Sequence, residues 1–117
     1  MIDWNRLRAL NNDFGAEAMG EVVAVFVAEM DDAVDQLPAI TDTGARADAL
    51  HTLKGTAANL GLVALADFCA EAEGTLRRDG PPQEFGGVVQ RVQTVYASSR
   101  AELLHGLPDR LGLSVQP

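Results

Sequence analysis

The sequence predicts an all-α fold, an antiparallel up-down four-helix bundle with a short additional N-terminal helix. Apolar residues make up 47% of the 117 residues but aromatic residues only 5%, a balance that suits closely packed helices. Apolar positions recur at intervals of three and four, and no segment alternates between apolar and polar residues as a half-buried strand does. Short connections separate the helical segments, so successive helices should pack as antiparallel neighbours.

The first two helices are predicted from a cap and an apolar stripe. Asp3 is a candidate N-cap for a short helix through WNRLRAL, and the polar NND that follows is expected to end it. A long second helix is predicted over about residues 15 to 37. Its apolar stripe comprises Val22, Phe26, Met30, Ala33 and Leu37. Pro38 should end or kink this helix, because proline has no backbone N–H to donate.

The next two helices have stronger boundary signals. The loop ITDTG offers Asp42 or Thr43 as the N-cap of a helix over residues 44 to 60, and Gly61 stands where a left-handed residue often ends a helix. A fourth helix is predicted over about residues 63 to 79, and the segment GPP should stop it. Its expected core face comprises Leu65, Cys69, Ala72 and Leu76.

The last predicted helix covers about residues 84 to 104, although two glycines weaken its start. Its stripe comprises Val88, Val92, Val95 and Ser99. The segment GLP at residues 106–108 is expected to close it, and DRLGLSVQP is expected to be frayed. We therefore expect one domain over residues 1–106 and a C-terminal tail over residues 107–117.

The charge balance narrows the classes of partner. Nine basic and seventeen acidic residues give a net charge of −8, which disfavours binding to nucleic acid and to anionic membrane surfaces. Two histidines, one cysteine and scattered carboxylates do not form a metal constellation. We expect neither a metal nor a cofactor, and we expect a protein or small ligand as the partner.

The cysteine usage and the hydropathy pattern suggest a cellular location. Cys69 is the only cysteine, so no disulfide can form within the chain, and a buried thiol in a reducing compartment is expected. The most apolar stretch, VVAVFVAEM, is broken by Glu29 and by aspartates before it reaches the length of a membrane span. No basic targeting leader is visible. These features predict a cytoplasmic protein. We also expect it to be a monomer.

The segment HTLKGTAANLG at residues 51–61 places a histidine, the only lysine of the chain and a glycine inside one predicted helix. A glycine there costs about 1 kcal/mol relative to alanine, so local stability does not explain it. At roughly 100° per residue, the core face comprises Leu50, Leu53, Ala57 and Leu60. A second stripe, centred on His51, comprises Gly44, Ala47, Lys54, Gly55 and Ala58.

The second stripe is typical of a histidine that another macromolecule must reach. Lys54 can lie beside the ring and offset the charge of a dianionic group attached there. Gly55 and Ala58 leave the ring open to a large partner. The residues alone also fit an ordinary surface histidine beside a solvated lysine, and small residues equally suit close helix packing. His105, near the predicted end of the last helix, is interpreted as structural.

The segment LHTLKGTAANLGLVALADFCAEAE resembles the phosphorylation-site region of histidine phosphotransfer (HPt) domains. The shared pattern is His, any residue, Leu, Lys, Gly, then Ser or Thr, small residues and Gly, followed by a helix with Cys and Glu. The resemblance extends more loosely over about residues 1 to 106. It implies that His51 is the phosphoacceptor, that Lys54 contacts the phosphoryl group, and that Gly55 gives the partner room.

The resemblance also suggests roles for less certain residues. Glu73 falls where some members place a carboxylate or amide near the imidazole, and Arg77 falls where some place a basic residue near the phosphate. Ala47 and Ala58 would join Gly55 in partner docking. The sequence departs from the family pattern in having Thr56 and Ala57 in place of a commoner pair of serines, and in a short ITDTG loop.

The function implied is that of a phosphocarrier in a two-component phosphorelay. The phosphoryl group would come from a receiver-domain aspartate or a histidine kinase, expected to be a hybrid kinase, and would pass to another receiver aspartate. Such a domain is not an enzyme, because the metal and most catalytic groups belong to the partner. The alternative is a docking bundle that binds or sequesters a receiver without being phosphorylated. A cofactor-binding bundle would need more inward-facing ligands than this sequence offers.

Overall fold

The computed structural model describes residues 1–82 and 84–113, and its regular secondary structure is helical. The elements are α1 (Trp4–Phe14), α2 (Ala16–Gln36), the short 3-10 helix η1 (Leu37–Ala39), α3 (Thr43–Asn59), α4 (Val63–Asp79) and α5 (Gly86–Leu111). Within the described residues, the only β-type pairing is one isolated bridge between Ile2 and Leu62. The predicted all-α class is therefore confirmed.

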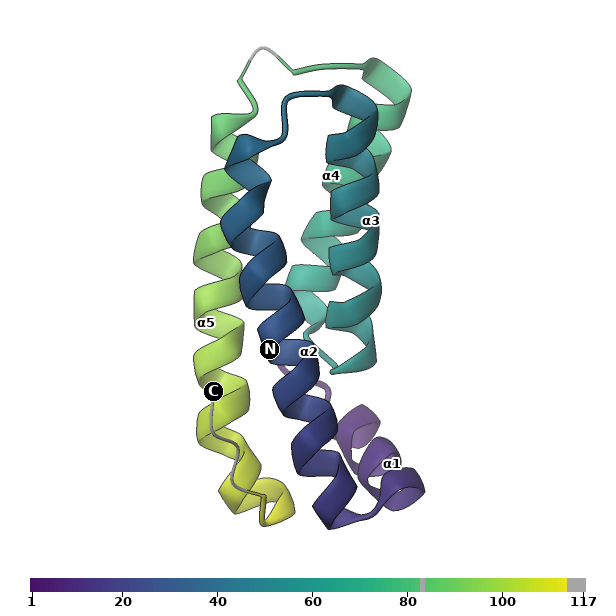
Figure 1. Ribbon diagram of the computed structural model, residues 1–117, viewed down its shortest axis with the longest axis vertical. Coiled ribbons are helices and arrows are strands. Elements are labelled where there is room, and N and C mark those ends of the chain that lie inside the picture. The colour runs from purple at the N-terminus through teal and green to yellow at the C-terminus, as the bar shows by residue number, and fades with distance from the viewer. Residues whose placement is uncertain (83, 114–117) are drawn as a thin grey trace.

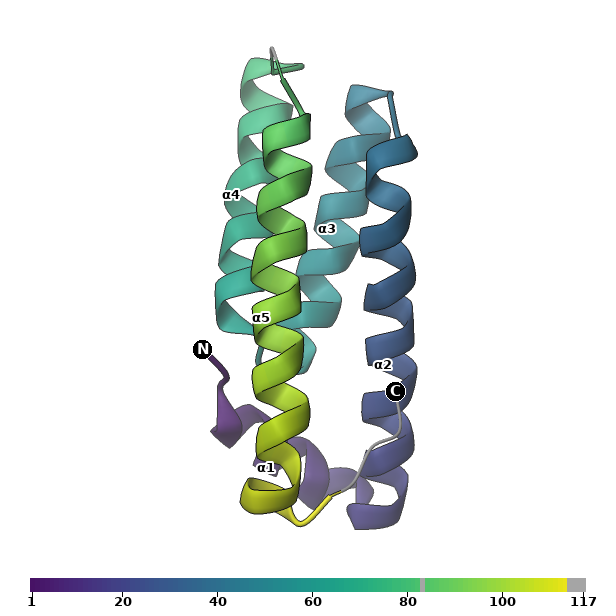
Figure 2. The same cartoon turned by 90° about the vertical axis from the view of Figure 1, so that its left-hand side faces the viewer.

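The four long helices α2 to α5 lie side by side along the longest dimension of a molecule that measures 45 × 22 × 20 Å (Figures 1 and 2). The connections from α2 to α3 and from α4 to α5 lie at the same end of the molecule (Figure 1). The helices α2 and α5 extend beyond the tight turn that joins α3 to α4. The short helix α1 lies at that extended end, where it packs against both α2 and α5.

Local chemistry fixes both ends of α3, the helix that carries the histidine. The Asp42 carboxylate accepts a hydrogen bond from the backbone N–H of Ala45 at 2.9 Å, which confirms Asp42 as the N-cap. Gly61 follows the helix with φ 73°. Its carbonyl accepts a hydrogen bond from the Asp3 N–H at 2.8 Å, and a Cβ at Gly61 would lie 2.6 Å from the Asp3 carbonyl oxygen. Gly61 is therefore required by its φ angle and by this close approach.

The predicted start of α1 is confirmed, but its predicted end is wrong. Asp3 caps the helix, because its carboxylate accepts a hydrogen bond from the Arg6 N–H at 3.2 Å. The polar residues of NND do not break the helix, which continues to Phe14. Asparagine and aspartate are only modestly unfavourable inside a helix. The stop comes instead from Gly15, whose φ of 83° is outside the helical region.

The buried faces of α2 and α5 are rotated from those predicted. On α2, Val22, Phe26 and Ala33 are only partly buried, and the buried residues are Met19, Val23, Val27, Met30 and Val34. On α5, Val88 and Val95 are partly buried, and the buried residues are Val89, Val92, Tyr96, Ser99, Leu103 and Leu107. Apolar residues at adjacent positions make two stripes possible in each helix, and packing selects one.

The predicted end of the last helix is also wrong. The helix α5 continues through Gly106 and Pro108 to Leu111. The Trp4 ring packs directly on the backbone of Gly106, where a Cβ would overlap the indole. Pro108 lies exposed in the last part of the helix, where its missing N–H removes a single hydrogen bond. The glycine and the proline therefore do not stop the helix, as we had expected.

The C-terminal segment is ordered further than predicted. Leu107 and Leu113 are buried, so residues 107–113 are not a frayed tail. Residues 114–117 of the predicted tail lie outside the described residues. The division of the chain at residue 106 stays a prediction. None of the helices within residues 1–82 and 84–113 has both the length and the hydropathy that crossing a membrane requires.

Candidate functional site

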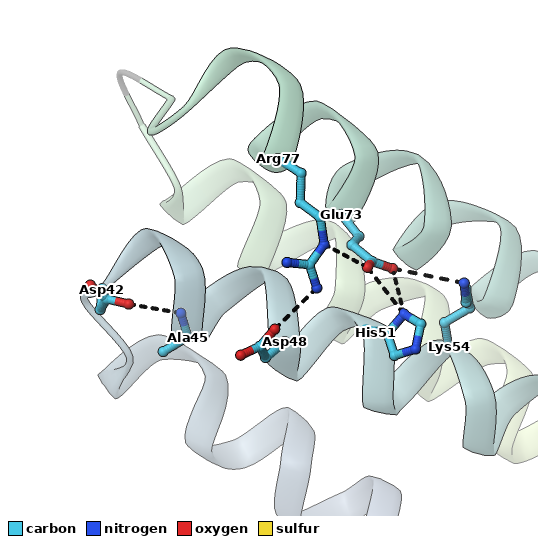
Figure 3. Close-up of polar contacts among 7 residues, drawn as sticks. All are labelled: Asp42, Ala45, Asp48, His51, Lys54, Glu73 and Arg77. Carbon is cyan, nitrogen blue, oxygen red and sulfur yellow. Dashed lines mark hydrogen bonds and ion pairs between the residues drawn. The ribbon is translucent and has the colours of Figure 1, made fainter.

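His51 lies in the middle of α3, and 60% of its side chain is exposed. Its Nδ1 atom lies 3.1 Å from each carboxylate oxygen of Glu73 on α4 (Figure 3). An ionised carboxylate only accepts hydrogen bonds, so we assign the proton of the neutral ring to Nδ1, which donates it to Glu73. The other nitrogen, Nε2, has no protein hydrogen-bond partner among the described residues and keeps a free lone pair.

Glu73 is the most enclosed member of this cluster, with only 12% of its side chain exposed. We predicted Ala72 on the core face of α4, but Glu73 is the buried residue at that level of the helix. Hydrogen bonds from the Arg77 guanidinium and from the His51 ring lower the pKa of Glu73, although burial acts in the opposite direction. The carboxylate therefore stays ionised near neutral pH.

Arg77 contacts two carboxylates, one on each helix. Its Nε donates to Glu73 Oε2 at 2.9 Å, and one terminal nitrogen donates to Asp48 Oδ1 on α3 at 3.1 Å. Both bonds raise the pKa of Arg77, the one to Glu73 most. We expected Arg77 near the phosphate; the structure places it against the carboxylate that holds the histidine ring. Asp48 was missed, because its place in the cluster depends on how α3 and α4 align.

Lys54 lies one turn after His51, on the other side of Glu73 from Arg77 (Figure 3). Its Nζ is 3.8 Å from Glu73 Oε1, and the side chain is partly exposed. This is a long and solvent-screened ion pair, which contributes little energy. The flexible ammonium is therefore free to turn toward another anion near the ring.

Small residues lie beside His51 on the surface of α3. Gly55 and Ala58 are exposed on the same helix. A Cβ added at Gly55 would meet no atom within 4 Å, so packing does not require a glycine there. Ala47 was predicted to take part in partner docking, but it is 2% exposed and belongs to the core. Its side chain is turned inward with Leu50, so it offers a partner almost no surface.

The other candidate residues do not join the cluster. Burial raises the pKa of the Cys69 thiol to about 12, so the thiol stays protonated and unreactive. His105 is exposed on α5, and it does not stand at the helix end as we had expected, because the helix continues to Leu111. Within residues 1–82 and 84–113, no group of three or more His, Cys, Asp or Glu side chains has a geometry suited to a metal ion.

The fold and the site together define a class of protein. An exposed imidazole with one free nitrogen, and with the other held by an ionised carboxylate, is a nucleophile suited to carrying a transferable group. A family model described as the Hpt domain matches residues 21–105, well over half of the chain. The chain therefore belongs to the Hpt domain family, whose members carry phosphoryl groups on histidine in phosphorelays and are not kinases.

The matched range begins within α2 and ends within α5, so it includes the whole of the histidine cluster and leaves α1 outside. Comparisons with curated proteins and with solved structures gave no match.

Proposed function

We propose that this chain is a histidine phosphotransfer protein of a two-component phosphorelay and that Nε2 of His51 carries the phosphoryl group. The observation that carries the proposal is the contact between Nδ1 of His51 and the buried carboxylate of Glu73. It leaves Nε2 as the nucleophilic nitrogen on an exposed ring. The membership of the Hpt family supports the same assignment.

The proposed transfer moves the phosphoryl group from a receiver aspartate to the His51 ring and then to the aspartate of the next receiver. The Nε2 lone pair attacks the phosphorus of an aspartyl phosphate, and the bond between phosphorus and the aspartate oxygen breaks as the carboxylate leaves. The phosphorylated ring keeps its Nδ1 proton and becomes positively charged, and Glu73 stabilises that charge. In onward transfer, an aspartate carboxylate of the next receiver attacks phosphorus, and neutral imidazole leaves with its Nδ1 proton.

Lys54 and Gly55 support the same step in different ways. The Lys54 ammonium is held only loosely by Glu73, so it can move to the phosphoryl oxygens and offset their charge. Gly55 leaves bare backbone one turn from His51, which gives a receiver domain room to bring its aspartate in line with Nε2. Ala58 would widen the same approach. Most catalytic groups, including a metal ion, would belong to the receiver.

The proposal also covers the partners, the bundle topology and the cellular location of the protein. The partners would be receiver domains and a hybrid histidine kinase, with no nucleic acid and no membrane surface, as the charge of −8 suggests. The four long helices would form an antiparallel up-down bundle, with the phosphotransfer domain over residues 1–106. The protein would act in the cytoplasm as a monomer and would not phosphorylate itself.

The test uses phosphorylated receiver domains from the organism that encodes the chain. The unmodified protein and His105→Gln should gain acid-labile, base-stable phosphate from at least one receiver, and His51→Gln should gain none. Because His51 is exposed, circular dichroism and the melting temperature of His51→Gln should match those of the parent. Labelling of His51→Gln would contradict the proposal. Receiver binding without any labelling of the parent would favour the alternative of a docking bundle.

A further inference from the structure

We propose that Arg77 and Asp48 are positioning residues that hold Glu73 against His51, and that Arg77 acts on phosphotransfer through Glu73 and not by contacting the phosphoryl group. This inference rests on the proposed function, since it assigns the roles of two further residues at the same site. The same contacts should fix the tautomer of His51 in the unphosphorylated protein, where no partner is needed to observe it.

The first support is a continuous chain of short contacts across the two helices. Asp48 on α3 accepts from Arg77 at 3.1 Å, Arg77 donates to Glu73 at 2.9 Å, and Glu73 accepts from His51 at 3.1 Å (Figure 3). Asp48 and His51, at the two ends of this series of contacts, are on α3. Glu73 and Arg77, in its middle, are one turn apart on α4. The position of the Glu73 carboxylate is thus fixed from both helices.

The second support is that Glu73 needs such a restraint. A glutamate side chain has several rotatable bonds, and the Glu73 carboxylate has a competing cation in Lys54, 3.8 Å from Oε1. Arg77 holds Oε2 through Nε, which limits rotation of the carboxylate toward the lysine. The same hydrogen bond is the largest cause of the lowered pKa of Glu73, so it also keeps the acceptor ionised.

The third support is the direction from which each cation approaches. Figure 3 shows Arg77 and Lys54 on opposite sides of the Glu73 carboxylate, and Arg77 already uses two nitrogens on carboxylates. The charged groups around the ring are Asp48 and Lys54 on α3 and Glu73 and Arg77 on α4. Of these two cations, Lys54 makes no short hydrogen bond within residues 1–82 and 84–113, where its one ion pair is 3.8 Å long, and so it is the cation available to an incoming phosphoryl group.

The exposure of Arg77 and Asp48 to solvent indicates that they do more than stabilise the fold. Arg77 is 48% exposed and Asp48 is 76% exposed, and ion pairs this open to solvent add little to the free energy of unfolding. Loss of Asp48 should therefore leave the melting temperature nearly unchanged, and loss of Arg77, which also removes a hydrogen bond to the enclosed Glu73, should lower it only modestly. A change at His51 would then report positioning and not a damaged fold.

Transfer kinetics separate an indirect role from a direct one. Arg77→Gln should slow phosphotransfer by about two- to fivefold, the range expected for a partly exposed charged contact. Arg77→Lys should recover part of that loss, because it keeps the charge. In a Glu73→Ala background, the same Arg77→Gln change should cause no further loss. An equal loss in both backgrounds would show that Arg77 acts on the phosphoryl group itself and would overturn the inference.

The decisive experiment measures the tautomer of neutral His51 by ¹⁵N NMR of the unphosphorylated protein in alkaline buffer. The parent should hold the proton mainly on Nδ1, and Arg77→Gln and Asp48→Asn should shift the population toward the Nε2-protonated form. Arg78→Gln is the matched control, because Arg78 is the next residue, is exposed and, in the part of the chain that the structure describes, pairs only with its neighbour Asp79. It should keep the parental tautomer.

The result separates this inference from the proposed function. Parental tautomer populations in Arg77→Gln would overturn the positioning role even if His51 is phosphorylated normally. A shifted tautomer in a protein that no receiver phosphorylates would support the positioning role while the proposed function fails.

Discussion

Both carboxylate oxygens of Glu73 lie 3.1 Å from Nδ1 of His51, although 22 positions separate the two residues in the sequence. The contact is possible because α3 and α4 are joined by a tight turn and pack closely along their length (Figure 1). It decides which ring nitrogen is free, and so which atom is available as a nucleophile.

Replacing Lys54 with alanine should slow phosphotransfer without unfolding the protein. The ammonium lies beside the ring and is held only by a long ion pair to Glu73 among the described residues. Losing a well-made charged contact in the transition state costs about 1.5 to 3 kcal/mol. Its ion pair with Glu73 is long, so the melting temperature should hardly change. Rapid-quench measurement of the transfer rate checks this. A rate equal to that of the parent would show that Lys54 is only a solvated surface residue.

The protein should fold without a glycine at position 55, but a receiver domain should need the small residue there to reach His51. A Cβ there meets open space, so Gly55→Ala should be neutral or stabilise the protein by up to about 1 kcal/mol. Gly55→Gln should fold normally but block transfer, because the longer side chain lies where the receiver approaches. The measurements are the melting temperature and the transfer rate of the same preparation.

The control for Gly55 is Gly20 on α2, another helical glycine whose added Cβ would meet no atom within 4 Å. Gly20→Gln should have little effect on either measurement. Transfer at the parental rate by Gly55→Gln would mean that the glycine is not there for access.

Acid should weaken the parent protein more than it weakens Glu73→Gln. The pKa of Glu73 is held below its ordinary value of about 4.5, chiefly by Arg77. A lowered carboxyl pKa stabilises the folded state fully above the ordinary value, and this stability is lost as the pH falls through the lower, folded-state value. Urea unfolding between pH 7 and pH 3 measures the difference. An equal loss of stability with falling pH in the two proteins would contradict the stabilising role of the ionised Glu73 carboxylate.

Substitution of Gly106, on which the Trp4 ring packs, should destabilise the folded protein. A Cβ at Gly106 would overlap the indole ring, so Gly106→Ala should cost about 1 to 3 kcal/mol as α1 shifts away from α5. Chemical denaturation followed by Trp4 fluorescence measures this cost. Gly87→Ala, at an exposed position in the first turn of α5 with no neighbour within 4 Å, is the control and should be neutral or stabilising. Equal effects of the two changes would contradict the packing described here.

The parts of the fold that depend on local chemistry were predictable from the sequence. The N-cap at Asp42 and the stop at Gly61 each act within a few residues, so a short window of sequence is enough to recognise them. The end of α5 was not predictable in this way. Gly106 looks like a helix stop, but it is a glycine because Trp4, about a hundred residues earlier, packs on it.

In the candidate site too, features set within one helix were predictable from the sequence, and contacts between helices were not. The positions of His51, Lys54 and Gly55 on one exposed face follow from helical spacing alone. The burial of Ala47 and the contact between Asp48 and Arg77 do not, because they depend on the rotation of α3 against α4. The resemblance to HPt domains pointed to Glu73, but not to the restraint that Arg77 and Asp48 place on it.

The most direct test locates the phosphoryl group on the histidine ring. The ¹⁵N-labelled protein is phosphorylated by a receiver domain and its histidine side chains are observed by ¹⁵N and ³¹P NMR in alkaline solution, where phosphohistidine is stable. We predict a single phosphohistidine, at His51, with phosphorus bonded to Nε2 and the ring proton on Nδ1 beside Glu73. Phosphorus on Nδ1 of His51, or on His105, would contradict the central claim that Glu73 leaves Nε2 of His51 as the acceptor.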